Sequence, residues 1–237
     1  MYGIHPVRAA LANPRRSVHR AILTARAAEA IGRPLLARVR HEIVSSEAVA
    51  GNLPPGAVHQ GVALLCAPLP PHDLRDLTAI RSELRMVVVV LDQITDPHNV
   101  GAILRSAAAF GATAVVVQDR HAPPESGALA KAASGALDAV PYVQVVNIAR
   151  ALDELGKRGF WRIALAGDGE QPLKEAVSAG DIAVVLGSEG SGLRRLVRER
   201  CDISATIPMK RAMDSLNVSN AAAIALYELR RDNSVEL

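Results

Sequence analysis

The amino-acid sequence predicts an α/β fold built on a parallel sheet. In the second half of the chain, unbroken apolar runs at residues 86–91, 114–117 and 182–186 alternate with helix-forming stretches. Such runs are typical of strands buried on both faces, and their alternation with helices indicates parallel strands joined by helical crossovers. With 237 residues, 49% of them hydrophobic, the chain is long enough for one large domain or two small ones.

The N-terminal part predicts a smaller unit. Apolar residues at helical spacing indicate helices over residues 7–12 and 18–31, and an apolar run at 62–66 indicates a strand. Three prolines between residues 68 and 71 then stiffen a connecting segment. We therefore expect an N-terminal domain over residues 1–70, a linker over 71–84 and a second domain over 85–237.

Further strands and helices are expected along the second domain. The strands lie at 140–146, 163–166 and 203–207, and the helices at 100–110, 126–136, 149–158, 192–200 and 217–231. In parallel sheets, ligands bind at the carboxyl ends of the strands. A functional site is therefore expected in the loops after Leu91, Leu186 and Ile207.

The charge of the chain is unevenly distributed. Residues 1–60 hold eight arginines against three glutamates, a net charge of +5, although the whole chain carries only +3. This imbalance favours a module that faces a polyanion, and the alternative is a basic face that only contacts water. Because aromatic residues make up only 3% of the chain, contact with the phosphates of such a polyanion is expected in place of base stacking. The candidate contacts are Arg8, Arg15, Arg16 and Arg20.

Cysteine usage and hydropathy suggest where the protein works. Cys66 and Cys201 are far apart and not at metal-ligand spacing, which favours a reducing compartment, and no metal is expected. The start of the chain lacks an apolar signal core, and no apolar run approaches the length of a membrane span. A cytoplasmic protein with no membrane partner is expected.

The loop after Leu91 leads into a helix with one unusual residue. Asp96-Pro97 predicts a turn, Asn99 can cap the helix, and Gly111 is expected to end it. Arg105 lies among small and apolar residues, where a guanidinium needs an anionic or polar partner.

The loop after Leu186 is rich in glycine. Gly187, Gly190 and Gly192 have the spacing G-x-x-G-x-G, which is neither the dinucleotide-binding pattern nor a P-loop, and Glu189 would repel a pyrophosphate. The glycines nevertheless permit a close approach between backbone and ligand.

The loop after Ile207 reaches a helix of small residues through residues 214–220. This segment is crowded with Asp, Ser and Asn side chains, which hydrogen-bond local backbone or cap helices. By itself it indicates either a ligand loop or a well-capped helix.

Together, the three loops resemble the three motifs of the SpoU (TrmH-like) branch of the SPOUT RNA methyltransferases. Residues 96–106, 186–193, and 207–209 with 215–219 match the motifs in order and spacing. The resemblance implies a parallel-sheet catalytic domain with a C-terminal trefoil knot, preceded by a small α/β RNA-binding domain. It also implies a homodimer that binds RNA, not DNA, with S-adenosylmethionine as the methyl donor.

The resemblance also assigns roles to individual residues. The polar active-site positions of the family correspond to Asn99, Arg105, Glu189, Ser215 and Asn217. The cofactor-binding positions correspond to Leu186, Gly187, Ile207, Met209 and Leu216.

The N-terminal sequence narrows the expected substrate. Residues 2–5 and 56–61 resemble family members that methylate a guanosine ribose 2′-hydroxyl in 23S rRNA. The same chemistry on tRNA or another rRNA site stays an alternative, as does an RNA-binding protein without catalysis. A nicotinamide-dependent oxidoreductase is disfavoured by the glycine spacing.

Overall fold

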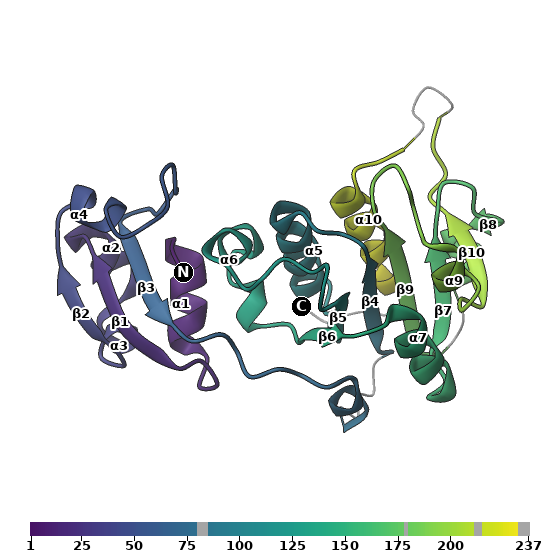
Figure 1. Ribbon diagram of the computed structural model, residues 1–237, viewed down its shortest axis with the longest axis horizontal. Coiled ribbons are helices and arrows are strands. Elements are labelled where there is room, and N and C mark those ends of the chain that lie inside the picture. Colours follow the sequence, from purple (N-terminus) through teal and green to yellow (C-terminus); the bar gives the residue numbers. More distant parts are fainter. Residues whose placement is uncertain (80–84, 178–179, 211–214, 232–237) are drawn as a thin grey trace.

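The computed structural model describes residues 1–79, 85–177, 180–210 and 215–231. The described residues form two sheets, a three-stranded one near the N-terminus and a seven-stranded one in the remainder (Figure 1). An α/β fold with a parallel sheet, preceded by a smaller α/β unit, is therefore confirmed. No described helix is long and apolar enough to cross a membrane.

The N-terminal module contains seven helices and strands over residues 4–66. They are α1 (Ile4–Ala12), β1 (Val18–Leu23), α2 (Ala25–Ile31), α3 (Arg33–Leu36), β2 (Arg40–Ile43), α4 (Ser46–Ala50) and β3 (Val62–Cys66). The strand expected at 62–66 is confirmed, whereas the helix expected over 18–31 is wrong for its first six residues. Those residues form the central strand, which pairs with β2 in parallel and with β3 in antiparallel orientation.

Tertiary pairing explains this error. Along β1, Ala21 and Leu23 are buried and alternate with the partly exposed Ile22, which is the period of a strand. Helical residues begin only after Thr24, whose side chain caps α2 by accepting a hydrogen bond from the Ala27 backbone (3.2 Å).

A connecting segment leaves β3 and reaches the short 3₁₀ helix η1 (Leu74–Ala79). The seven strands that follow are β4 (Val87–Asp92), β5 (Ala114–Gln118), β6 (Tyr142–Val145), β7 (Trp161–Leu165), β8 (Gln171–Pro172), β9 (Ile182–Gly187) and β10 (Ile203–Thr206). They lie in the order β6-β5-β4-β9-β7-β10-β8, and every pairing is parallel.

Helices cover both faces of this sheet. One face packs against α5 (Pro97–Ala109), α6 (Gly127–Ala133) and α10 (Val218–Arg231), and the other against α7 (Ile148–Lys157), α9 (Arg195–Arg198) and η1. The short helices η2 (Ala136–Asp138) and α8 (Leu173–Ala176) complete the domain. Along β4, Val87, Val89 and Leu91 face the first layer and the intervening valines the second, so residues 87–91 are all apolar and Asp92, the last residue, is the strand's charged one.

The trefoil knot stays a prediction. Residues 211–214, part of the segment that would form it, lie outside the described residues.

Candidate active site

Three loops converge at the carboxyl ends of β4, β9 and β10. The side chains of Asn99, Glu189 and Asn217, one from each loop region, form a single hydrogen-bonded cluster. The Asn217 amide donates to Glu189 Oε1 (2.6 Å) and to Asn99 Oδ1 (3.0 Å), and the Asn99 amide also donates to Glu189 Oε1 (3.3 Å). Three of the five polar positions expected from sequence therefore lie in direct contact.

The start of α10 orients two members of this cluster. Asn217 is the N-cap residue, because its side-chain oxygen accepts a hydrogen bond from the Ser219 backbone N–H (3.0 Å). The backbone N–H of Val218 donates to Glu189 Oε1 (3.3 Å). A carboxylate at a helix N-terminus is stabilised by the helix dipole, so this position suits the negative charge of Glu189.

The cap of α5 differs from expectation. Asp96, not Asn99, caps the helix by accepting a hydrogen bond from the His98 backbone N–H (2.9 Å), and Pro97 occupies the first turn. Asn99 lies inside that turn, which leaves its amide free to join the cluster. The other end is as expected: Gly111 has a left-handed φ of 64°, and Ala112 N–H donates to the Ala107 carbonyl (2.8 Å), which is a Schellman ending.

A cavity of about 470 Å³ opens beside the polar cluster, a volume within the usual range for small-molecule sites. All five residues expected to bind the cofactor line it, and so do two of the expected active-site residues: Leu186, Gly187, Ile207, Met209, Leu216, Glu189 and Ser215. Among the described residues, its charged lining consists of the carboxylates of Asp168 and Glu189 and the guanidinium of Arg198, a net charge of −1 for these residues. This charge favours a ligand that carries a positive group.

Gly187 is needed for the backbone to close this cavity. A Cβ atom at this position would lie 2.2 Å from the Gly192 carbonyl carbon and 2.4 Å from the Leu193 nitrogen. Sequence reasoning expected the glycine to admit a ligand. In the structure, the absence of a Cβ at Gly187 makes room for the loop's own backbone. This loop folds back, and the Gly192 N–H donates to the Ser188 carbonyl (2.9 Å).

An ion pair with a buried carboxylate, which sequence reasoning missed, supports the glycine-rich loop. Asp92 is fully buried at the end of β4 and pairs in register with Gly187. Its carboxylate accepts hydrogen bonds from the backbone N–H of Arg194 (2.9 Å) and from the Arg194 guanidinium (2.8 Å), which also donates to Gln118 (2.9 Å). The available signal was an acidic residue directly after a fully apolar strand.

The loop after β7 and the end of α9 each contribute a residue that was not predicted. Asp168 and Arg198 line the cavity and form an ion pair (2.8 Å), and this contact lowers the pKa of Asp168. The sequence gives no motif for this loop, so it does not predict Asp168 as a site residue.

Arg105 and Ser215 lie outside the hydrogen-bonded cluster. Both are exposed, and within the part of the chain that the structure describes, Arg105 forms no ion pair or hydrogen bond. The anionic or polar partner expected for Arg105 is therefore not found among the described residues, because this face of the helix is open to water. An exposed guanidinium without a partner can bind an external anion.

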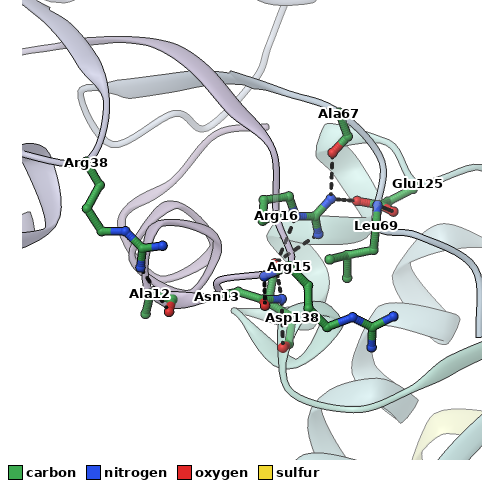
Figure 2. A network of polar contacts seen from close by, with 9 residues as sticks. All are labelled: Ala12, Asn13, Arg15, Arg16, Arg38, Ala67, Leu69, Glu125 and Asp138. Carbon is green, nitrogen blue, oxygen red and sulfur yellow. Dashed lines mark hydrogen bonds and ion pairs between the residues drawn. The ribbon is translucent and has the colours of Figure 1, made fainter.

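The four arginines expected to contact RNA have different environments. Arg8, Arg15 and Arg20 are exposed; Arg15 contacts His72 (2.7 Å), and Arg20 pairs with Glu42 (3.0 Å). Arg16 is buried, and its side chain, which has no exposed surface, pairs with Asp138 and Glu125 (Figure 2). The expectation that Arg16 faces RNA is therefore wrong in this structure.

Comparisons with known proteins cover both parts of the chain. The family "RNA 2'-O ribose methyltransferase substrate binding" matches residues 1–72, and the SpoU rRNA Methylase family matches residues 86–227. The 23S rRNA (guanosine-2'-O-)-methyltransferase RlmB of Vibrio vulnificus is 38% identical over 239 residues, which cover 98% of this chain and 96% of the relative. The RlmB of Coxiella burnetii is 42% identical over 175 residues, 73% of this chain and 70% of the relative.

Solved structures share the fold. The SpoU methyltransferase AviRb of Streptomyces viridochromogenes, in complex with AdoMet, has a TM-score of 0.80 at 25% identity and covers 98% of this chain and 89% of its own. A second solved structure, which concerns the 2-OH methylation of C/U34 on tRNA, has a TM-score of 0.57 at 29% identity. The match covers 63% of this chain and 97% of that one. From the family matches and the full-length relatives, the chain belongs to the SpoU family of RNA methyltransferases.

Proposed function

We propose that this protein methylates the 2′-hydroxyl of a guanosine ribose in 23S rRNA, with S-adenosylmethionine as the methyl donor. The main support is that Asn99, Glu189 and Asn217 meet beside a cavity at the strand ends, in a chain matched along almost its full length by 23S rRNA methyltransferases. We propose residues 1–70 as the RNA substrate-binding domain, 71–84 as the linker and 85–237 as the methyltransferase domain. The cytoplasm is then the proposed site of action.

The cavity fits the methyl donor chemically. Half-buried Ile207 and Leu216 offer apolar contact for an adenine ring, and the backbone at Leu186 and Gly187 offers polar groups. The net charge of −1 over the described lining residues complements a sulfonium. When bound, S-adenosylmethionine supplies an electrophilic methyl group.

Arg105 has a role toward the RNA in this proposal. A guanidinium stays protonated in proteins, so Arg105 is a poor proton acceptor. Its exposed, unpaired charge suits binding of the phosphate beside the target ribose and stabilisation of the developing alkoxide. The proton of the 2′-hydroxyl then passes to a phosphate oxygen or to water.

Asn99, Glu189, Ser215 and Asn217 complete the proposed active site. Asn99, Glu189 and Asn217 hold one another in a fixed arrangement, which reduces the entropy lost when reactants are oriented. Ser215 lies on the cavity wall with an exposed side chain that can contact a ligand. Exposed Arg8, Arg15 and Arg20 are the proposed phosphate contacts of the N-terminal domain.

The family resemblance implies a homodimer, and α10 offers a face for it. Ile224 and Tyr227 are 42% and 55% exposed, three residues apart on one side of the helix. The Tyr227 ring meets Phe110 of α5 edge-on, with ring centroids 6.1 Å apart. We propose this apolar face as part of the contact between two copies.

The proposed activity predicts transfer of labelled methyl from S-adenosylmethionine to unmodified 23S rRNA, with an alkali-resistant linkage at the labelled nucleotide. Unmodified tRNA serves as the competing substrate, because one structural relative concerns tRNA but matches only 63% of this chain. Label on tRNA alone would keep the chemistry and overturn the target. Absence of cofactor binding would overturn the enzyme proposal.

Arg105→Ala is expected to reduce kcat on the order of 10²–10³-fold, because the alkoxide loses its charged partner. Arg105→Lys keeps a point charge without the planar fork and should retain part of the activity. Calorimetry should find S-adenosylmethionine affinity unchanged in both variants. An equal loss of cofactor affinity in the alanine variant would contradict this role.

Gly187→Ala is expected to weaken S-adenosylmethionine binding at least about tenfold, since relieving a Cβ overlap with fixed backbone costs about 1–3 kcal/mol and displaces the loop. Gly180→Ala, just before the same strand, is the matched control because its added Cβ meets no atom within 4 Å. Titration calorimetry compares the two. Equal affinities would show that the loop adapts without loss.

Glutamate at both Ile224 and Tyr227 is expected to shift the protein toward monomer, because charge in an apolar contact is costly to bury. Leu196→Glu changes a similarly exposed apolar residue (56%) on α9 and should leave the assembly unchanged. Sedimentation velocity measures both. If the wild-type protein sediments as a monomer, the proposed dimer is wrong.

A further inference from the structure

The N-terminal module is attached to the methyltransferase domain through a buried charge. The Arg16 guanidinium donates to both carboxylate oxygens of Asp138 (2.9 and 3.1 Å), to Glu125 and to the Ala67 carbonyl (3.1 Å) (Figure 2). Only 4% of the residue is exposed, and its side chain is completely enclosed. Burial alone would lower the pKa of Arg16, but its hydrogen bonds to Asp138 and Glu125 outweigh this effect and raise it.

Other groups of the first module and the connecting segment bind the same two carboxylates. The Asn13 amide donates to Asp138 Oδ1 (3.1 Å), and the Leu69 backbone N–H donates to Glu125 Oε2 (3.0 Å). Asp138 is therefore bound by the loop after α1, whereas Glu125 is bound by the segment that follows β3. A single orientation of the module satisfies all these donors.

Close packing surrounds the ion pair. The Tyr2 ring lies so near Gly127 that an added Cβ would come within 2.5 Å of it, and at Gly135 an added Cβ would be 3.0 Å from the Ala9 side chain. Figure 1 shows α1 next to α6, where these contacts occur. Because small residues permit this approach, the two bodies meet along a fitted surface.

The same helix layer reaches the active site. α6 packs on α5 at Gly101, where an added Cβ would lie 2.4 Å from the Ala132 Cβ and 2.8 Å from the Ala133 nitrogen. Gly101 lies two residues after Asn99 and four before Arg105. α6 therefore contacts the RNA-binding module on one side and the helix of Asn99 and Arg105 on the other.

We propose that Arg16 is a positioning residue: by pairing with Asp138 and Glu125, it fixes the N-terminal module relative to α5 and so determines which nucleotide of the bound RNA reaches Arg105. This inference rests on the proposed function. An enclosed ion pair gives orientation more than stability, because desolvation offsets much of its attraction, but removal of one partner leaves the other charge buried and unpaired. A solvent-exposed arginine would contribute to RNA affinity without setting an orientation.

Steady-state methylation of full-length 23S rRNA by the full chain tests the proposal. Arg16→Gln is expected to raise KM for RNA on the order of tenfold and to spread methylation to additional nucleotides, mapped by alkaline ladders, while S-adenosylmethionine affinity stays the same. Arg16→Lys should give an intermediate result. Adding Asp138→Asn to Arg16→Gln should cost little more, because the pair acts as a unit.

A matched control separates orientation from stability. Arg162→Gln breaks the pair with Asp202 (2.5 Å) within the methyltransferase domain, whose side chains are mostly buried (19% and 22% exposed), and should lower the unfolding midpoint without changing the methylated position. Hydrogen exchange gives a readout independent of activity: amides of residues 124–138 should exchange faster in Arg16→Gln only.

Three outcomes would overturn the positioning role. They are unchanged KM with one methylated nucleotide in Arg16→Gln, unchanged exchange over residues 124–138, and a parallel loss of cofactor binding. A wild-type protein that methylates no RNA would instead refute the proposed function, and the exchange measurement would still test the docking.

Discussion

The carboxylate of Glu189 joins three parts of the chain that are far apart in sequence. One of its oxygens accepts hydrogen bonds from Asn99, from Asn217 and from the first backbone N–H of α10. Parallel strands place their carboxyl ends at one edge, but they do not by themselves determine how the loops meet. The Glu189 carboxylate determines how they meet, because donors from the other two segments share its oxygen as their acceptor.

The carboxylate of Asp92, at the end of β4, supports this arrangement. Asp92 is fully buried, where an unpaired charge would be expensive, and Arg194 meets it with both backbone and side-chain donors. Since Arg194 follows the glycine-rich loop and Asp92 ends β4, the pair closes that loop over the neighbouring strand. Glu189 can then reach the first turn of α10 because the loop that carries it has a fixed base.

The sequence predicts strands correctly where both of their faces are buried. It is misleading where the environment of a residue depends on partners that are distant in the chain. The sequence predicts β4 and β9 correctly because helices cover both faces of the sheet, so residues 87–91 and 182–186 are all apolar. β1 was taken for a helix because three apolar residues happened to fit helical spacing, and only its pairing with β2 and β3 decides otherwise. The placing of Asn99, Glu189 and Asn217 followed from family motifs, whereas Asp92 and Asp168 had no motif to identify them.

Charge was the least reliable guide to environment. Arg16 and Arg15 are adjacent in a basic stretch, yet one is enclosed and the other exposed. No local pattern separates them, because the partners of Arg16 lie 109 and 122 residues away. Conversely, Arg105 stands in an apolar stretch but faces water, since a helix presents only part of its surface to the core.

The proposed chemistry requires a source of selectivity outside the reacting groups. A ribose 2′-hydroxyl and its neighbouring phosphate are present at every RNA nucleotide, so neither Arg105 nor the Asn99 cluster can distinguish one target from another. The few aromatic residues leave little scope for reading bases by stacking. Recognition must then combine the shape of the RNA held by the N-terminal module with the distance and angle from that module to α5. A buried, multiply bonded arginine at the junction provides such a fixed angle, because rotating the module would expose two carboxylates to one another without their shared cation.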